Sequence, residues 1–430
     1  MNLETIRIGL AGLGTVGTGL VQILENNRSW INKRLGKDLI IKNILVSDLQ
    51  KNRPILPDAH TVLTDRTQDL IDDPDLDIIV ELIGGLDTAY DLIKNSLLAG
   101  KSVVTANKAL LAERGPELFE LAAQRDLGLY YEASVAGGIP IVQTLKESLA
   151  GNRIKSLTGI LNGTANFILS EMTQKNLAYE QALALAQDKG YAEADPALDV
   201  DGLDAAHKLT VLIRLAYGQD YPLQDLPVYG IRGVDQYDIL RAGDFGYVLK
   251  LIAQVKEKSG SLQAGVFPAL VRNDHMLAKV DGPFNAILLE GNAVGPIMLY
   301  GQGAGDLPTG SAVLADIMTL VNRKSFYNNT GFLETSLPKA SILPPELTAA
   351  KHYFRFTVQD RPGVLSVLSG IMGEQNISIA QVVQKQEANG KTVPVVFLTH
   401  TAQLKDVNSA MNEISKLDFI KAPTVHYRLL

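Results

Sequence analysis

The chain has 430 residues, which is too long for one compact core, so we expect two or three domains. The composition is 46% hydrophobic and 20% charged, which is ordinary for a globular protein and excludes a disordered or fibrous chain. The formal net charge is -7 and both signs are scattered along the chain, which argues against nucleic-acid binding.

Short apolar runs alternate with helical patterns in the first third of the chain. The predicted strands are Ile6–Leu10, Leu39–Val46, Asp77–Leu82, Ser102–Thr105 and Leu127–Glu132. A helix follows the first strand, and another covers about Thr88 to Leu98. This alternation is typical of a parallel sheet with both faces covered. The sequence therefore predicts an α/β fold that begins with a Rossmann-like domain over residues 1–138.

A glycine-rich turn follows the first strand and opens the next helix. Its residues are Gly12, Leu13, Gly14, Thr15, Val16 and Gly17. Gly12 permits a tight turn, Gly14 lets the backbone approach a pyrophosphate, and Gly17 allows close helix–sheet packing. A structural turn without a ligand is the alternative. The position between a strand and a helix favours dinucleotide binding.

The end of the second strand bears on which dinucleotide binds. Asp48 would hold the ribose diol of NAD, whereas Lys51 and Arg53 would neutralise the 2′-phosphate of NADP. A solvated charged turn is a third reading, and the sequence leaves the three open. The loop Thr105–Lys108 also follows a strand and is expected to line the cleft. From there Lys108 would reach phosphate or substrate, unless it is an ordinary surface lysine.

The pattern changes from about Ile139. The predicted elements are a helix at Pro140–Leu149, a strand at Lys155–Leu161, a helix-rich stretch through Tyr217, and β-like runs at Gly265–Val271 and Phe284–Glu290. This order predicts an α+β domain over residues 139–305, with a sheet covered by helices on one side. A helix at Thr309–Val321, within residues 306–333, is expected to return and pack on the first domain.

Five carboxylates and a lysine lie within sixteen residues, from Glu193 to Lys208. A solvated acidic loop would explain such a composition. However, Asp204 and Lys208 are spaced i,i+4 on a helix whose following turns are apolar, so they share one face. Such a carboxylate can orient the ammonium group that gives a proton to a developing alkoxide. His207 lies about 100° round the helix from Lys208 and is expected to be structural.

The segment Glu334–Leu347 carries three prolines and little periodicity, so residues 334–350 are predicted to be a linker. Residues 351–430 are predicted to form a separate unit. Its elements in order are a strand at Tyr353–Val358, a helix at Gly363–Gln375, strands at Ile377–Gln386 and Thr392–Thr399, a helix at Leu404–Lys416, and a strand at Val425–Leu430. This βαββαβ order is the ferredoxin-like, split βαβ arrangement.

The sequence contains no cysteine, which excludes disulfides, thiolate metal sites and thiolate nucleophiles. Aldehyde oxidation through a thiohemiacetal is therefore excluded, and reversible reduction of an aldehyde to an alcohol stays open. The first residues lead into a strand without the features of a signal peptide, and no apolar run has the length of a membrane span. We therefore expect a cytoplasmic protein that does not bind a membrane.

Several motifs in this order resemble those of the homoserine dehydrogenase family over almost the whole chain. They are GLGTVG at Gly12–Gly17, TANKALLA at Thr105–Ala112, EASVAGGIPI at Glu132–Ile141, LNGTANFIL at Leu161–Leu169, GYAEADPALDVDGLDAAHKL at Gly190–Leu209, and GQGAG at Gly301–Gly305. The resemblance implies the reduction of L-aspartate 4-semialdehyde to L-homoserine with NAD(P)H, in the biosynthesis of threonine, methionine and isoleucine. It also implies that residues 139–305 bind substrate and mediate dimerisation.

The resemblance assigns roles to individual residues. It makes Lys208 the proton donor and Asp204 its partner, and it places Lys108 beside the nicotinamide and the substrate. Further implied contacts are Glu193 and Asp199 with the amino acid, Thr105 and Gly303 with the cofactor, and Glu132, Val135, Gly137 and Ile139 with a structural sodium ion, three of them through backbone carbonyls. Many members carry an arginine where Ser47 stands, and that arginine favours NADP. NADP is therefore only modestly preferred, and NAD stays possible.

The C-terminal unit resembles an ACT domain. Asp360 and Gly363 lie at its first strand-to-helix turn and Asn376 at the next helix-to-strand turn. Such domains pair and bind amino acids at the shared interface, so the resemblance implies a homodimer or higher oligomer that is inhibited by threonine. Asp360, Gly363 and Asn376 are the candidate effector contacts. A domain that only dimerises is the alternative.

Two other functions compete with this reading. One is a non-catalytic amino-acid sensor that keeps a nucleotide fold, although such a sensor has no use for the aligned pair Asp204 and Lys208. The other is a reductase of a different semialdehyde or keto acid on the same scaffold.

Overall fold

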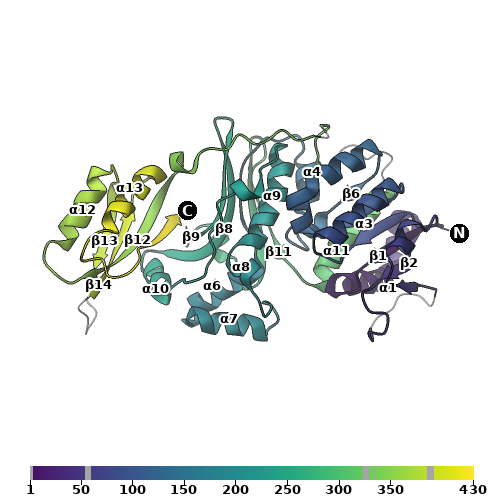
Figure 1. Cartoon of the computed structure of the whole chain (residues 1–430), viewed down its shortest axis with the longest axis horizontal. Coiled ribbons are helices and arrows are strands. Elements are labelled where there is room, and N and C mark those ends of the chain that lie inside the picture. The colour runs from purple at the N-terminus through teal and green to yellow at the C-terminus, as the bar shows by residue number, and fades with distance from the viewer. Residues whose placement is uncertain (1–2, 54–59, 323–328, 335, 385–391) are drawn as a thin grey trace.

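The computed structural model describes residues 3–53, 60–322, 329–334, 336–384 and 392–430. The molecule is elongated: one sheet lies at the N-terminal end, and a second sheet runs from the middle to the C-terminal end (Figure 1). Within the described residues the first sheet has six strands and the second has ten. None of the helices in these ranges is long and apolar enough to cross a membrane.

The first sheet has the order β3-β2-β1-β4-β5-β6, and its neighbouring strands are parallel. The strands are β1 (Glu4–Ala11), β2 (Lys37–Leu45), β3 (Val62–Thr64), β4 (Ile78–Glu81), β5 (Ser102–Thr105) and β6 (Leu129–Tyr130). The helices between them are α1 (Thr15–Leu35), α2 (Gln68–Ile71), α3 (Asp87–Leu98) and α4 (Lys108–Gln124). The predicted Rossmann-like sheet is confirmed, although the short β3 was not predicted. The strand order reverses between β1 and β4, and the loops that leave this point diverge to form a ligand crevice.

The helix α11 (Asp306–Asn322) lies against α1, far from its neighbours in sequence (Figure 1). Val313 and Ile317 of α11 are fully buried in the same core as Leu20 of α1 and Ile8 of β1. The helices approach closely because Gly19 has no side chain; a Cβ there would overlap the Asp306 carbonyl. The chain thus returns to the first sheet after building the second one.

The middle of the second sheet has the antiparallel order β11-β10-β7-β8-β9. These strands are β7 (Ile154–Ile160), β8 (Tyr247–Lys258), β9 (Ser261–Arg272), β10 (Phe284–Gly291) and β11 (Gly295–Gln302). The strands β8 and β11 were not predicted. In β8 the buried side chains Lys250 and Gln254 interrupt the apolar pattern, and β11 is a partly exposed edge strand.

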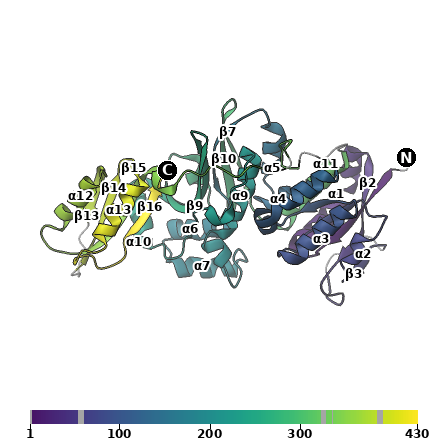
Figure 2. The ribbon, with the colours of Figure 1, turned by 45° about the horizontal axis from the view of Figure 1, so that its top comes forward.

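Helices cover this part of the sheet mainly from one side (Figure 2). They are α6 (Gly163–Lys175), α7 (Tyr179–Asp188), α8 (Ala197–Val200), α9 (Leu203–Tyr217) and α10 (Gln236–Asp244). The prediction of one continuous helix at Pro140–Leu149 was wrong. The chain makes a short turn of α-helix, α5 (Ile141–Gln143), and then a wider π-helical turn at Thr144–Ser148. Short 3₁₀ turns lie at Glu132–Ser134, Leu223–Asp225, Met276–Lys279 and Pro345–Leu347.

The C-terminal unit has the strand order β16-β12-β14-β13, with two helices on one face. Its elements are β12 (Ala349–Gln359), α12 (Val364–Glu374), β13 (Ile379–Gln384), β14 (Thr392–Thr399), β15 (Ala402–Gln403), α13 (Leu404–Ile414) and β16 (Val425–Leu429). The predicted βαββαβ fold is confirmed. The last two residues of the strand predicted at Ile377–Gln386 lie outside the described residues.

The C-terminal unit is joined to the central sheet and does not stand apart from it. Strand β16 pairs in parallel with β9, where Arg428 faces Ala269 and the Leu430 amide donates to the Leu270 carbonyl over 2.9 Å. Beside this joint, the buried Asp238 of α10 accepts hydrogen bonds from Tyr353 and Arg355 of β12. The pairing of β16 with β9 makes one continuous sheet out of two predicted units, and the Asp238 contacts reinforce the joint.

The proline-rich linker is also fixed to the central domain. Asp220 donates its amide to the Pro338 carbonyl over 2.8 Å and accepts the Ala340 amide over 2.8 Å. Leu262 of β9 donates to the Ser341 carbonyl over 2.7 Å. The linker is therefore held to the central domain by backbone hydrogen bonds at two points, Asp220 and Leu262.

Candidate functional site

The glycine turn between β1 and α1 forms a cradle with one open side. A Cβ at Gly12 would lie against the Leu82 carbonyl, and a Cβ at Gly17 would overlap the Gly12 carbonyl, so packing requires both glycines. Gly14 is different, because no atom of the described residues lies within 4 Å of the position of its Cβ. It caps the N-terminus of α1 without a side-chain hydrogen bond. Free amides and open space at a helix N-terminus fit a pyrophosphate.

A cavity of about 540 Å³ extends from this turn over the ends of β2 and β4. Gly12, Leu13 and Gly14 line it on one side, and Ser47, Lys51 and Arg53 line it on the other. Asp48 is absent from its lining: the Asp48 carboxylate accepts the Gln50 amide over 2.8 Å, and its carbonyl accepts the Arg53 guanidinium. Lys51 and Arg53 therefore line this end of the crevice together with Asp65, whereas Asp48 does not.

The buried Glu81 holds two loops beside this crevice, and it was not predicted as a site residue. It lies at the end of β4, and it accepts hydrogen bonds from the Ile83 and Gly84 amides and from the Thr105 hydroxyl over 2.9, 3.0 and 2.5 Å. Burial raises the pKa of Glu81, whereas these three donors oppose the rise. The Thr105 side chain points at Glu81 and lines neither cavity, so its side chain positions the loop that leads to Lys108.

A larger cavity of about 800 Å³ lies between the glycine turn and the central domain. It brings together candidates from distant parts of the sequence: Thr15, Val16, Lys108, Gly137, Glu193, Asp199, Asp204, Lys208 and Gly303. The Asn285 amide occupies the position that a Cβ of Gly303 would take, so only glycine fits there. The two sheets thus contribute to one site.

A buried carboxylate between two lysines forms the centre of this cavity. The Asp204 carboxylate lies 2.7 Å from Lys208 Nζ on the next turn of α9, and 3.2 Å from Lys108 Nζ at the start of α4. Lys208 Nζ also donates to the Leu161 carbonyl over 2.7 Å. Asp204 and Lys208 are both buried, whereas the Lys108 side chain is 41% exposed toward the cavity.

The charged groups in this cluster shift the pKa values of Asp204 and Lys208. Burial would raise the pKa of Asp204, but the charges of Lys208 and Lys108 hold it well below the ordinary value. Burial lowers the pKa of Lys208 and the charge of Lys108 lowers it further, while the Asp204 carboxylate opposes both. Asp204 is therefore ionised, and Lys208 gives up its proton more readily than an ordinary lysine.

Asn162 connects the carboxylates of Asp199 and Asp204, and it was not predicted as a site residue. Its Nδ2 donates to Asp199 over 2.6 Å and to Asp204 over 2.8 Å, while its Oδ1 accepts the Ala165 amide at the start of α6. Burial raises the pKa of Asp199, and the Asp204 charge adds to this rise. Asn162 lies in a motif that was recognised, but its contacts with Asp199 and Asp204 had no signal in the sequence.

Among the other residues of the acidic stretch Glu193–Lys208, some line the cavity and others make structural contacts. Glu193 is exposed and lines the cavity. Asp195 caps the start of α8, and Asp201 forms an ion pair with Arg232 over 2.6 Å. His207 lines a smaller neighbouring cavity of about 320 Å³, and burial lowers its pKa.

The four residues of the implied sodium site lie in one short stretch, where the 3₁₀ turn Glu132–Ser134 is followed by a tight turn at Ala136–Ile139. Ala136 and Gly137 have φ of 56° and 53°, and Ile139 closes the tight turn by donating its amide to Ala136. The buried Glu132 carboxylate accepts the Val142 and Gln143 amides over 2.8 and 2.7 Å. Among the described residues no cluster of three or more His, Cys, Asp or Glu side chains could hold a metal ion.

A second carboxylate is buried beside Glu132. Asp316 of α11 accepts the Glu132 amide over 2.7 Å. Burial raises the pKa of Glu132 to about 7, and burial with the Glu132 charge raises the pKa of Asp316. The charge of Lys146 opposes both shifts. Two buried carboxylates and carbonyls of a tight turn are the kind of environment that fits a hard cation.

The candidate effector residues lie at opposite ends of α12. Asp360 and Gly363 precede the helix, and the Gly363 backbone has φ of 90° with open space around it. Asn376 follows the helix and is exposed, with φ of 58°. The eleven residues of α12 separate these ends by about 16 Å. A single copy of the chain therefore does not bring the three residues into one site.

Comparison with known proteins gives consistent results over the whole chain. Family models match residues 12–132 (homoserine dehydrogenase, NAD binding domain), 140–318 (homoserine dehydrogenase) and 352–419 (ACT domain). A homoserine dehydrogenase of Neisseria gonorrhoeae is 38% identical over 432 residues, which cover 99% of each chain. One of Synechocystis sp. is 41% identical over 427 residues, which cover 97% of this chain and 98% of the relative.

Solved structures agree with these matches. A homoserine dehydrogenase from Thiobacillus denitrificans has a TM-score of 0.92 and 39% identity, covering 100% of this chain and 99% of that one. One from S. aureus has a TM-score of 0.76 and 34% identity, with the same coverage. A hyperthermophilic archaeal homoserine dehydrogenase in complex with NADPH has a TM-score of 0.62 and 26% identity, covering 75% of this chain and 100% of that one.

Proposed function

The chain belongs to the homoserine dehydrogenase family of oxidoreductases, and on that premise we propose how its own residues carry the reaction. The reaction is the reversible reduction of L-aspartate 4-semialdehyde to L-homoserine, in the biosynthesis of threonine, methionine and isoleucine. The observation that carries this proposal is the Asp204 carboxylate held between Lys108 and Lys208, in the cavity that reaches the glycine turn.

A nicotinamide dinucleotide supplies the hydride when it is bound. The open amides at Gly14 and the first turn of α1 hold its pyrophosphate, and Gly303 borders its nicotinamide end. Lys51 and Arg53 line the far cavity while Asp48 does not, which supports NADP as the preferred cofactor. NAD remains usable, because Ser47 contributes no charge.

The substrate lies with its two ends against opposite charges. Glu193 and Asp199 hold its ammonium group, with Asn162 keeping the Asp199 carboxylate in place. Lys108 and Lys208 lie at the aldehyde end, where positive charge stabilises the negative charge that develops on the carbonyl oxygen. Holding the carbonyl between these groups supplies much of the acceleration through proximity.

Lys208 donates the proton that completes the alcohol. A charged lysine has three N–H donors, and two of those on Lys208 are directed at Asp204 and the Leu161 carbonyl. The third is free to protonate the oxygen of the reduced carbon. In the reverse direction the neutral lysine takes the hydroxyl proton of homoserine. Asp204 fixes the position of Nζ throughout.

Replacing Lys208 with alanine should lower kcat for homoserine oxidation by about 100- to 10,000-fold, because the general acid–base group is lost. NADP binding, followed by titration with NADPH, should stay unchanged. The control is Lys175→Ala, which removes the lysine of another i,i+4 acid–lysine pair outside the cavity, Glu171–Lys175. Assays with NADP and with NAD also measure cofactor preference. Substantial turnover of Lys208→Ala would disprove the assignment.

Replacing Asp204 with asparagine should move the pH profile to lower pH. Burial lowers the pKa of Lys208, and the Asp204 charge raises it again in part, so removing that charge lowers the pKa further. The alkaline decline of kcat for reduction, which needs charged lysine, should then begin at a lower pH. The acid limb for oxidation, which needs neutral lysine, should shift the same way. Glu171→Gln is the control, and an unshifted profile contradicts the proposal.

Threonine inhibits the enzyme through paired ACT domains. Asp360 and Gly363 of one copy meet Asn376 of a second copy at the shared edge, which is how residues at opposite ends of α12 can form one site. The chain is accordingly at least a homodimer. Light scattering should give at least twice the mass of the chain, and a monomer with full activity would contradict this.

Asn376→Ala in the full chain should weaken threonine inhibition without changing kcat, because Asn376 is far from Lys208. The measurement is the threonine concentration that halves activity, compared with Lys405→Ala on the exposed face of α13. Point variants are needed because removal of the ACT unit would also remove β16 from the central sheet. Unchanged inhibition in Asn376→Ala would refute this contact.

A sodium ion is held by the Glu132 carboxylate and the backbone carbonyls of Val135, Gly137 and Ile139. It is structural and balances the charge buried at Glu132 and Asp316. Sodium chloride should therefore raise the unfolding temperature above that in the same concentration of choline chloride, and Glu132→Gln should remove the difference. Equal unfolding temperatures of the parent chain in both salts would exclude the ion.

A further inference from the structure

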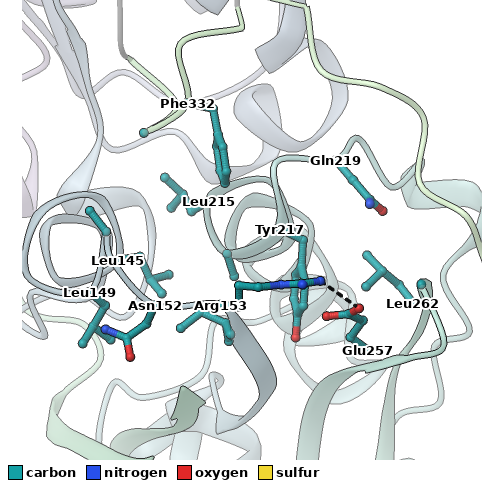
Figure 3. Close-up of a pocket in the computed structure, with 15 residues that line it drawn as sticks. Leu145, Leu149, Asn152, Arg153, Leu215, Tyr217, Gln219, Glu257, Leu262 and Phe332 are labelled. Carbon is teal, nitrogen blue, oxygen red and sulfur yellow. Dashed lines mark hydrogen bonds and ion pairs between the residues drawn. The ribbon is translucent and has the colours of Figure 1, made fainter. Parts of the chain in front are cut away.

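A separate cavity of about 360 Å³ lies at the C-terminal end of α9, which also carries Lys208 (Figure 3). Tyr217, the last residue of α9, lines this cavity, and Lys208 lies about 13 Å back along the helix axis. None of the residues assigned above lines it. Its size is at the small end of the range for ligand pockets.

Two side chains that line this cavity each carry a buried oxygen atom that lacks a hydrogen-bond partner. They are the Tyr217 hydroxyl and Gln219 Oε1, and neither has a partner among the described residues. Leaving such an atom unpaired costs about 1–3 kcal/mol, so buried polar atoms are normally paired. Both oxygens can accept a hydrogen bond, and a turn of either side chain toward the cavity would let a ligand that donates N–H groups pair with it.

A weak ion pair lies across the cavity. Arg153 reaches toward Glu257, with 3.5 Å between the nearest guanidinium nitrogen and carboxylate oxygen (Figure 3). The Arg153 side chain is 80% exposed and that of Glu257 is 29% exposed. Such an exposed pair contributes little to stability, so each partner remains able to bind a charge on a ligand. Burial, and then the Glu257 charge, raise the pKa of the Tyr217 hydroxyl, which therefore stays neutral.

Apolar side chains form the rest of the wall. Leu145 and Leu149 come from the turn after α5, Leu215 from α9, Leu262 from β9, and Phe332 from the segment after α11 (Figure 3). The cavity thus combines an apolar surface with acceptor oxygens, a carboxylate and a guanidinium.

We propose that this cavity binds a small α-amino acid with an apolar side chain. Its ammonium group donates to Glu257, Gln219 and Tyr217, and its carboxylate pairs with Arg153. Its side chain packs against the leucines and Phe332. The cavity differs from both the catalytic cavity and the ACT turns, so this ligand is neither the substrate nor the proposed ACT effector.

The position of the cavity connects it to catalysis. A bound amino acid contacts α9, which carries Asp204 and Lys208, and the turn that follows α5. The first amides of α5 are held by Glu132. A ligand that favours one arrangement of these elements changes the affinity for homoserine, and homoserine changes its affinity by the same factor.

Calorimetric titration of the full chain with L-leucine tests the proposal. One saturable site per chain is expected. Both 4-methylpentanoate, which lacks the ammonium group, and 3-methylbutylamine, which lacks the carboxylate, should bind at least about tenfold more weakly, since hydrogen bonds to charged groups are lost. Equal affinity for either analogue would overturn the proposed contacts. So would the absence of binding of leucine, valine and phenylalanine up to about 10 mM.

Variants locate the site. Glu257→Gln and Tyr217→Phe should each weaken leucine binding, and Tyr217→Phe should not lower stability because it removes an unpartnered hydroxyl. Lys155→Met, which breaks the exposed Lys155–Glu290 pair on the neighbouring strands, is the matched control. Parent-like affinity in both pocket variants would refute the site.

Competition separates this site from the other two. Leucine should still bind to Lys208→Ala, where the proposed catalysis fails, and to Asn376→Ala, where the proposed ACT contact is removed. Loss of binding in Asn376→Ala, or full displacement by saturating homoserine, would move the ligand to the ACT turns or the catalytic cavity and overturn the inference.

Discussion

The molecule is organised around one buried carboxylate that faces two cations from different parts of the chain. Lys108 begins a helix of the first sheet, Lys208 belongs to the central domain, and Asp204 touches both. An isolated charge at this depth would be strongly unfavourable, and the charges of the two lysines keep the Asp204 carboxylate ionised. The same contact that orients the proposed proton donor Lys208 therefore also joins the first sheet to the central domain.

Features with a local physical cause could be predicted from the sequence. Buried parallel strands are continuous apolar runs, and the turn Gly12–Gly17 is recognisable because packing at Gly12 and Gly17 excludes side chains. Strands were missed where side-chain chemistry hides the pattern. In β8 the buried Lys250 donates to the Val280 carbonyl over 2.6 Å, so a core position carries a charged residue. The pairing of β16 with β9 has no local signal, because it joins distant segments through backbone atoms.

The residues of the candidate site also fall into those that could be predicted from the sequence and those that could not. The pair Asp204 and Lys208 follows from helical spacing, but the third member, Lys108, joins them only through tertiary packing. Asn162 and Glu81 were missed because a polar residue at a turn has the same sequence context whether it caps a helix or holds an active-site loop. Thr105 shows the converse, since a residue in a matching motif turns its side chain away from the cavity. All three side chains are buried, so their hydrogen-bond partners, which sequence does not report directly, separate these cases.

The continuous sheet also sets an order for biosynthesis. Strand β9 lies between β8 and β16, and β16 comes after every other strand of the sheet along the chain. Synthesis of the segment between Arg272 and Val425 takes roughly 10 to 30 seconds at ribosomal speed. On the edge of β9 that faces β16, Val266 already pairs with Pro227 and Tyr229, but the part at Ala269 and Leu270 that will receive β16 is unpaired throughout this interval. Unpaired edges invite pairing with other nascent chains. On a polysome, where identical chains emerge side by side, this edge is where assembly between copies would go wrong first.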